Sequence, residues 1–177
     1  MMEAHDEAQR LKDLGQDLFR AGELEEAAET FVQARHRFAE SAHRNAEGEM
    51  VNNLGVVYLR LDELEKADAY LSEARSIFEE TGNRSGLGIV LCHQGMLRAA
   101  QDRPEHAVRL FEASIELLEE MGEPDQAKLV RREMRKVTGE GFPMSVARGL
   151  MRLLGRVTGT SAGDEEAQEA PEAEEGS

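Results

Sequence analysis

Apolar and small residues recur at spacings of three and four along most of the chain, and this pattern itself returns every forty residues. Gly15, Gly55 and Gly95 mark equivalent positions in three successive units. The residues that follow each glycine in the same register are Ala27, Ala67 and Ala107, then Phe31, Leu71 and Phe111, then Ala34, Ala74 and Ser114, then Phe38, Phe78 and Leu118. Because three- and four-residue spacings place side chains on one face of a helix, each unit is predicted to contain two helices.

A short turn separates the two predicted helices of each unit. Gly22, Asp62 and Asp102 occupy equivalent positions in these turns, and acidic residues follow them at the start of the second helix. Pro104 suits the first turn of a helix, because its missing N–H has no partner there. We also expect Gly15 to lie where the paired helices cross, since the absence of a side chain lets two backbones approach.

Composition agrees with helices and limits the function. Aromatic residues make up 5% of the chain, and there is no Trp, which favours helices over strands. The formal charge of −15 argues against a general nucleic-acid binder, because phosphates require a basic face. Cys92 is the single cysteine, so no intrachain disulfide forms. With no signal peptide and no membrane-spanning run expected, the prediction is a cytoplasmic protein.

The second unit carries a known signature. Residues 52–74 resemble the tetratricopeptide repeat, whose first helix has Leu-Gly followed by Tyr and whose second helix has Ala, a large apolar residue and Ala; the matching residues are Leu54, Gly55, Tyr58, Ala67, Leu71 and Ala74. The forty-residue period resembles the variant of cell-polarity scaffolds and bacterial regulators. The resemblance covers about residues 8–137. The third unit departs from it, because Gln94 replaces the Leu and Arg98 replaces the Tyr.

This resemblance implies an all-α fold, a right-handed α-solenoid of three helix-turn-helix units. A fourth first helix, "PDQAKLVRREMRKV", is charged and lacks Leu-Gly. We interpret it as a capping helix, because the end of a stack otherwise leaves a bare face. The predicted domains are a solenoid with its cap at 1–138, a basic amphipathic helix at 139–160 and an acidic, disordered tail at 161–177.

In this family the first helices line a concave groove, so the resemblance also implies a site. The expected groove residues are Lys12, Gln16, Phe19 and Arg20, then Asn52, Asn53, Val56, Leu59 and Arg60, then Ile89, His93 and Met96. The implied function is a non-catalytic adaptor or scaffold that binds a partner peptide or helix. An Asn at the place of Asn53 often holds the backbone of an extended peptide in this family; the alternative is a solvated or internally bonded amide. Lys12, Arg20 and Arg60 favour an acidic partner.

Other functions find little support in the sequence. Of the five side chains with which some family members clamp a chaperone's C-terminal carboxylate, only Lys12 and Asn53 are present. No phosphate-binding loop, dinucleotide fingerprint or paired-cysteine spacing occurs. Cys92 beside His93 is the one candidate nucleophile, but adjacent helical residues diverge by about 100°. We therefore predict no enzyme activity, no cofactor and no metal site.

The C-terminal part has an uneven charge distribution. Residues 143–159, "PMSVARGLMRLLGRVTG", predict a short helix with an apolar face and a basic face; its residues are Arg148, Leu150, Arg152, Leu153, Leu154, Arg156 and Val157. Three interpretations stay open: the helix packs on the solenoid, binds another protein, or lies on an anionic membrane. The alternative function is thus a membrane-recruited or self-assembling scaffold, with homo-oligomers included.

Overall fold

The computed structural model describes residues 2–139, and in this range the chain forms seven α-helices and no strand. The helices are α1 (Met2–Ala21), α2 (Leu24–Glu40), α3 (Arg44–Arg60), α4 (Leu64–Thr81), α5 (Arg84–Ala100), α6 (Pro104–Glu120) and α7 (Pro124–Thr138). The predicted all-α solenoid is confirmed. The predicted amphipathic helix and acidic tail lie outside the described residues.

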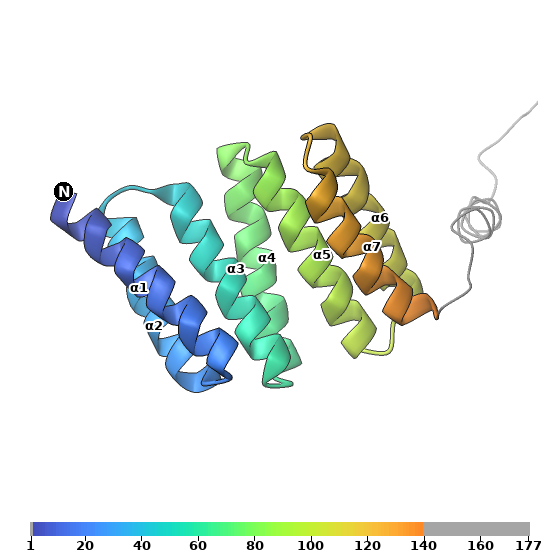
Figure 1. Cartoon of the computed structure of the whole chain (residues 1–177), viewed down its shortest axis with the longest axis horizontal. Coiled ribbons are helices and arrows are strands. Elements are labelled where there is room, and N and C mark those ends of the chain that lie inside the picture. The colour runs from blue at the N-terminus through green and yellow to red at the C-terminus, as the bar shows by residue number, and fades with distance from the viewer. Residues whose placement is uncertain (1, 140–177) are drawn as a thin grey trace, which may run out of the picture. The chain divides into compact units, whose positions relative to one another are not determined.

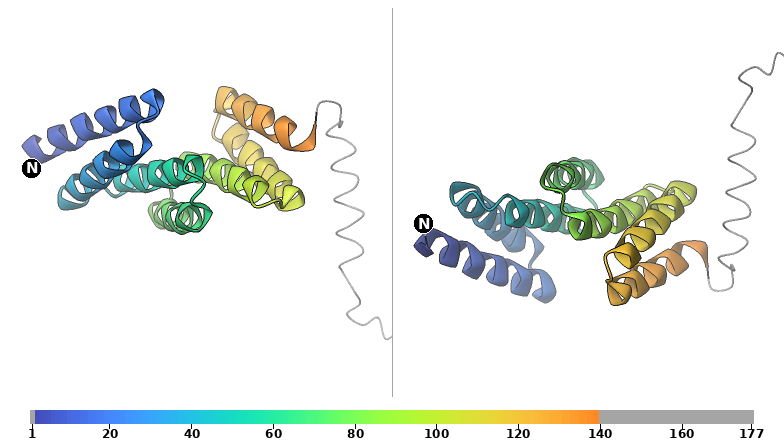
Figure 2. Two further views of the ribbon diagram at one scale, coloured as in Figure 1. Left: turned by 90° about the horizontal axis from the view of Figure 1, so that it is seen from below. Right: turned by 90° about the horizontal axis from the view of Figure 1, so that it is seen from above.

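The helices reproduce the forty-residue period of the sequence. α2, α4 and α6 begin at residues 24, 64 and 104, and α3, α5 and α7 begin at residues 44, 84 and 124. Each helix packs against the next, and in Figure 1 α1, α3, α5 and α7 lie in front while α2, α4 and α6 lie behind them. Seen from below or from above, α1 and α7 lie toward the same side, and α4 lies on the opposite side (Figure 2). The described helices therefore curve around the face that carries α1, α3, α5 and α7.

Each turn contains one residue in the left-handed conformation. The three equivalent residues within the units have φ angles of 88° at Gly22, 60° at Asp62 and 56° at Asp102. The turn closes with a hydrogen bond that reaches back five residues, as from the Glu63 N–H to the Tyr58 carbonyl at 2.9 Å. Asp tolerates this conformation better than most side chains, which explains why this position holds either Gly or Asp.

The forty-spaced glycines pack against the second helix of their own unit. A Cβ added to Gly15 would lie 2.7 Å from the ring of Phe31, and one added to Gly95 would lie 2.8 Å from the ring of Phe111. Real Cβ atoms do not come this close to a ring carbon. The predicted role of Gly15 at the helix crossing is thus confirmed, and its contact is the large residue sixteen positions later.

α7 packs on α6 as the first helix of a fourth unit. Val130 and Met134 are each 4% exposed, and they occupy the positions of Met50 and Leu54, which bury the α3 face against α2. At the other end, the equivalent Leu14 is 51% exposed, because no described helix precedes α1. The predicted capping role of α7 agrees with this packing.

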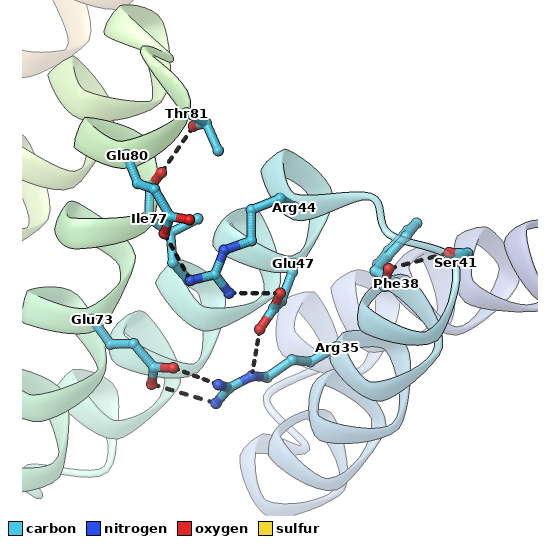
Figure 3. Close-up of polar contacts among 9 residues, drawn as sticks. All are labelled: Arg35, Phe38, Ser41, Arg44, Glu47, Glu73, Ile77, Glu80 and Thr81. Atoms are coloured by element: carbon cyan, nitrogen blue, oxygen red, sulfur yellow. Dashed lines mark hydrogen bonds and ion pairs between the residues drawn. The ribbon is translucent and has the colours of Figure 1, made fainter.

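A network of ion pairs joins α2, α3 and α4 (Figure 3). Glu47 is 7% exposed and accepts from Arg44 at 2.8 Å. Its other carboxylate oxygen lies 3.5 Å from Arg35. Arg35 also pairs with Glu73, and Arg44 pairs with Glu80 at 3.0 Å. The sequence pattern did not predict this network, because its bonded pairs lie up to 38 residues apart.

Candidate binding groove

Two adjoining cavities lie between α1, α3 and α5, each with a volume of about 310 Å³. Gln16, Asn53 and His93 belong to the walls of both cavities, so the two cavities adjoin at these three residues. Phe19, Arg20 and Val56 complete much of the first wall, and Lys12, Asn52 and Ile89 belong to the second. The three first helices therefore bring nine of the twelve expected residues to one surface, which we call the groove.

The remaining three expected residues lie at or beyond its edge. Leu59 is half-buried and packs against the core formed by α3, α4 and α5. Met96 is half-buried, and Arg60 is exposed beside Phe19. None of them belongs to the walls of the two cavities. The helical period alone places all three residues on the groove side, but it does not predict how far each side chain reaches into the groove.

Asn52 and His93 form a hydrogen bond between α3 and α5. Asn52 is 6% exposed, and its Oδ1 lies 2.9 Å from Nδ1 of His93. An amide oxygen only accepts, so Nδ1 carries the proton. Burial lowers the pKa of His93 to about 4, because the protonated ring would lose its hydration. The ring is therefore neutral near pH 7, and its Nε2 is a hydrogen-bond acceptor in the groove.

Asn53 presents an uncommitted amide at the centre of the groove. Its side chain is half-buried and lines both cavities. Within residues 2–139 no hydrogen bond engages it, whereas the neighbouring Asn52 is bonded to His93. The amide supplies both donors and an acceptor. The two adjacent asparagines thus have different roles, one fixing the wall and one facing the space.

The cations of the groove already have partners in the structure. Lys12 Nζ lies 2.5 Å from Glu49, and Arg20 lies 2.5 Å from Asp17. The guanidinium of Arg60 lies 4.8 Å from the centroid of the Phe19 ring and donates to the Phe19 carbonyl at 3.3 Å. The sequence predicts an acidic partner from these cations. Such a partner would have to compete with the contacts that the cations already make.

Glu49 is a groove residue that the sequence pattern did not predict. Glu49 lines the second cavity and lies forty residues before Ile89, which was expected there. This repeat register was the available signal. Its carboxylate neutralises Lys12, so the centre of the groove is closer to neutral than the expected set of residues suggested.

Cys92 and His93 do not form a nucleophile and base pair. Cys92 is 8% exposed, and burial, followed by the charge of Glu133, raises the pKa of its thiol to about 12. A thiol with this pKa stays protonated near pH 7, whereas nucleophilic cysteines are thiolates. The imidazole Nδ1 is bonded to Asn52 instead.

Among residues 5–139, no group of three His, Cys, Asp or Glu side chains is arranged to hold a metal ion. None of the described helices is both long and apolar enough to cross a membrane.

Comparisons with known proteins agree with the repeat geometry. Residues 47–120 match the family model described as "Tetratricopeptide repeat". No curated protein matches the chain. Among solved structures, the crystal structure of BtubC (BKLC) from P. vanneervenii is similar in fold, with a TM-score of 0.61 and 16% identity over 95% of this chain and 71% of that chain. Repeats of this family generally mediate protein–protein interaction and are typically non-catalytic. Over residues 47–120 this chain therefore consists of tetratricopeptide repeats.

Proposed function

We propose that this protein is a non-catalytic cytoplasmic adaptor whose groove binds an extended segment of a partner protein through the partner's main chain. The single observation that carries this proposal is the uncommitted amide of Asn53 in the walls of both cavities. A half-buried amide that makes no side-chain hydrogen bond within the protein keeps its donors and its acceptor available for a ligand.

The chemistry of the groove suits a peptide backbone. The amides of Asn53 and Gln16 offer donors and acceptors, and Nε2 of neutral His93 offers an acceptor. A peptide group supplies the complementary N–H and C=O. Phe19 and Val56 in the first cavity, and Ile89 in the second, provide apolar surface for alternate side chains of the bound segment. Recognition through the main chain gives affinity, and these apolar surfaces give selectivity.

The test is capture of partners from native lysate with the full-length chain as bait. Asn53→Ala should remove the groove-dependent partners or reduce their recovery about tenfold, as expected for two hydrogen bonds worth about 1.4 kcal/mol together. Gln33→Ala is the matched control, because it removes an exposed amide from α2 without touching the groove. Helicity measured by circular dichroism should be unchanged in both variants. Equal recovery with Asn53→Ala and wild type would exclude the groove as the binding site.

A second candidate function rests on the charge pattern of residues 143–159. We propose that this segment can recruit the protein to an anionic membrane or to another copy of itself. Three arginines and an apolar face give only weak membrane affinity by themselves. The full-length chain and a Leu150→Asp/Leu154→Asp variant would be compared by co-sedimentation with anionic vesicles and by analytical ultracentrifugation. Identical behaviour of both proteins in both assays would exclude this candidate.

A further inference from the structure

The first cavity of the groove has an apolar interior with two aromatic rings. Phe19 lines it from α1, Val56 lines it from α3 and Phe31 lines it from α2. Phe31 is only 2% exposed, so its ring forms the floor of the cavity, whereas Phe19 and Val56 are half-buried. In the second unit the positions of the two phenylalanines hold Leu59 and Leu71. The pair of rings therefore distinguishes the first unit from the second.

The volume of this cavity sets the size of the side chain that it can hold. The cavity measures about 310 Å³, whereas a protein cavity of about 150 Å³ already holds a benzene molecule. There is thus room for a phenyl or an indole ring, while a small side chain such as that of Ala would leave most of the space unfilled. Apolar walls gain no contacts from unfilled space, so a large side chain is favoured.

The charge of the walls narrows the class of side chain further. Arg20 brings a positive charge to the walls, and no carboxylate belongs to them among the described residues. A Lys or Arg side chain of a partner would therefore meet a like charge without a counter-ion. A carboxylate would lose water against Phe19, Phe31 and Val56 and would gain only one exposed cation. An uncharged, largely apolar side chain fits these walls best.

Arg20 also distinguishes an aromatic side chain from an aliphatic one. A guanidinium is attracted to the electron-rich face of a ring within about 6 Å, and Arg60 already has this geometry, with its Cζ 4.8 Å from the centroid of the Phe19 ring. Arg20 itself is held by an ion pair with Asp17 in which the two side chains are 68% and 74% exposed. Such exposed pairs are weak, so Arg20 can turn over a bound ring, while Phe19 and Phe31 offer aromatic contacts from the other sides.

The first cavity adjoins the polar groups that suit a peptide backbone. Asn53, Gln16 and His93 belong to its walls and also to the walls of the second cavity. A peptide group that is bonded to Asn53 lies at this junction, and the side chain next to that peptide group lies beside the first cavity. Main-chain and side-chain recognition can therefore act on the same residue of a partner.

We propose that the first cavity holds one aromatic side chain of the partner segment, packed against Phe19, Phe31 and Val56 and covered by Arg20. This inference rests on the proposed function, because it names the side chain by which the bound segment is selected. An aliphatic side chain and a second copy of this chain are the alternative occupants, and the experiment separates them from an aromatic side chain.

The probes are the N-acetyl amides of phenylalanine, cyclohexylalanine and alanine, each of which carries one side chain between two peptide groups. Phenylalanine and cyclohexylalanine have side chains of similar size, but only phenylalanine has an aromatic face. Binding to the full chain is followed by proton–nitrogen correlation NMR, and we expect a Kd of about 1 mM for the phenylalanine probe. This probe should bind at least about fivefold more tightly than the cyclohexylalanine probe and about tenfold more tightly than the alanine probe.

Two variants identify the cavity. Val56→Phe places a ring inside it and should weaken the phenylalanine probe about tenfold. Arg20→Gln changes an exposed side chain, so the fold is kept, and it should reduce the preference for phenylalanine over cyclohexylalanine to less than about twofold. Arg10→Gln is the matched control, because it changes an exposed arginine of the same helix outside the cavity walls, and it should leave the preference unchanged. Circular dichroism verifies the helicity of each variant.

Four outcomes would overturn the proposal. Equal affinity for the phenylalanine and cyclohexylalanine probes would assign the cavity to aliphatic side chains. Concentration-dependent shifts of the Gln16 and Asn53 amide signals without any probe would show that a second copy of the chain fills the cavity. The other two are no binding at about ten times the expected Kd, and an affinity and preference that neither Val56→Phe nor Arg20→Gln changes.

Asn53→Ala tests the proposed function separately, because it removes main-chain recognition and should weaken all three probes by the same factor. A loss with Val56→Phe but none with Asn53→Ala would keep the aromatic side chain in the cavity and exclude recognition through the main chain. A loss with Asn53→Ala but none with Val56→Phe would keep the proposed function and exclude the aromatic side chain.

Discussion

Gly55 lies against Leu71 so closely that a Cβ at Gly55 would stand 2.6 Å from Cγ of Leu71 and 3.3 Å from its backbone nitrogen. Ala favours a helix over Gly by about 1 kcal/mol, but overpacking of a core contact costs about 1–3 kcal/mol. We expect Gly55→Ala to lower the free energy of unfolding by about 1–2 kcal/mol, measured by urea denaturation.

A double variant tests the physical cause of this loss. Leu71→Ala removes the side-chain atoms that the new Cβ would meet, so Gly55→Ala should cost less in that background, or stabilise it through helix propensity alone. The same loss in both backgrounds would show that the contact with Leu71 is not the reason for the glycine.

Leu14 and Leu54 are equivalent in sequence and different in burial. Leu54 is fully buried between α3 and α2, whereas Leu14 is 51% exposed. Leu54→Ala should therefore lower the free energy of unfolding by about 3–5 kcal/mol. Leu14→Ala should change it by less than about 0.5 kcal/mol, as exposed substitutions usually do. Thermal unfolding of the two variants provides the comparison, and equal losses would indicate that Leu14 is covered in solution, for example by a second copy of the chain.

The repeat fold was predictable because its determinants are local or periodic. Gly15, Gly55 and Gly95 mark the helix crossings, and Gly22, Asp62 and Asp102 mark the turns. Each of these roles depends on the size or backbone preference of one residue, and the forty-residue period repeats the evidence three times. The helix boundaries follow from the same period.

Contacts between units were not predictable from the pattern. Lys12 pairs with Glu49 and His93 pairs with Asn52 across 37 and 41 residues, and helical periodicity states which side a residue faces but not which side chain it meets. The carboxylate partners of Lys12 and Arg20 therefore changed the interpretation of the groove from basic to closer to neutral. Gln94 and Arg98 were identified as departures from the family signature. The pattern did not show that Tyr58, the residue equivalent to Arg98 in the second unit, stacks on Tyr70.

Glu47 provides the test of such a contact between units. Its carboxylate is almost buried and meets Arg44 at 2.8 Å and Arg35 at 3.5 Å. Glu47→Ala should lower the free energy of unfolding by about 2–3 kcal/mol, because two guanidinium groups lose the nearly buried carboxylate that they share. Glu73 pairs with Arg35 but is 41% exposed, so the control Glu73→Ala should cost less than about 1 kcal/mol. A smaller loss for Glu47→Ala than for Glu73→Ala, measured by urea denaturation, would contradict this assignment.

The depressed pKa of His93 predicts how stability depends on pH. The folded value is about 4, against 6.5 for the unfolded chain, so between these values the unfolded state binds more protons. The stabilising contribution is complete above pH 6.5 and is lost as the pH falls toward 4, by as much as about 3 kcal/mol.

Urea denaturation at pH 7.5, 6.5, 5.5 and 4.5 should show a smaller loss of stability in His93→Gln than in wild type, because Gln keeps an amide donor near Asn52 and does not ionise. The other acidic groups contribute equally to both proteins, and His106→Gln, a change of an exposed histidine, should follow wild type. Parallel curves for His93→Gln and wild type would show that His93 ionises freely in the folded groove.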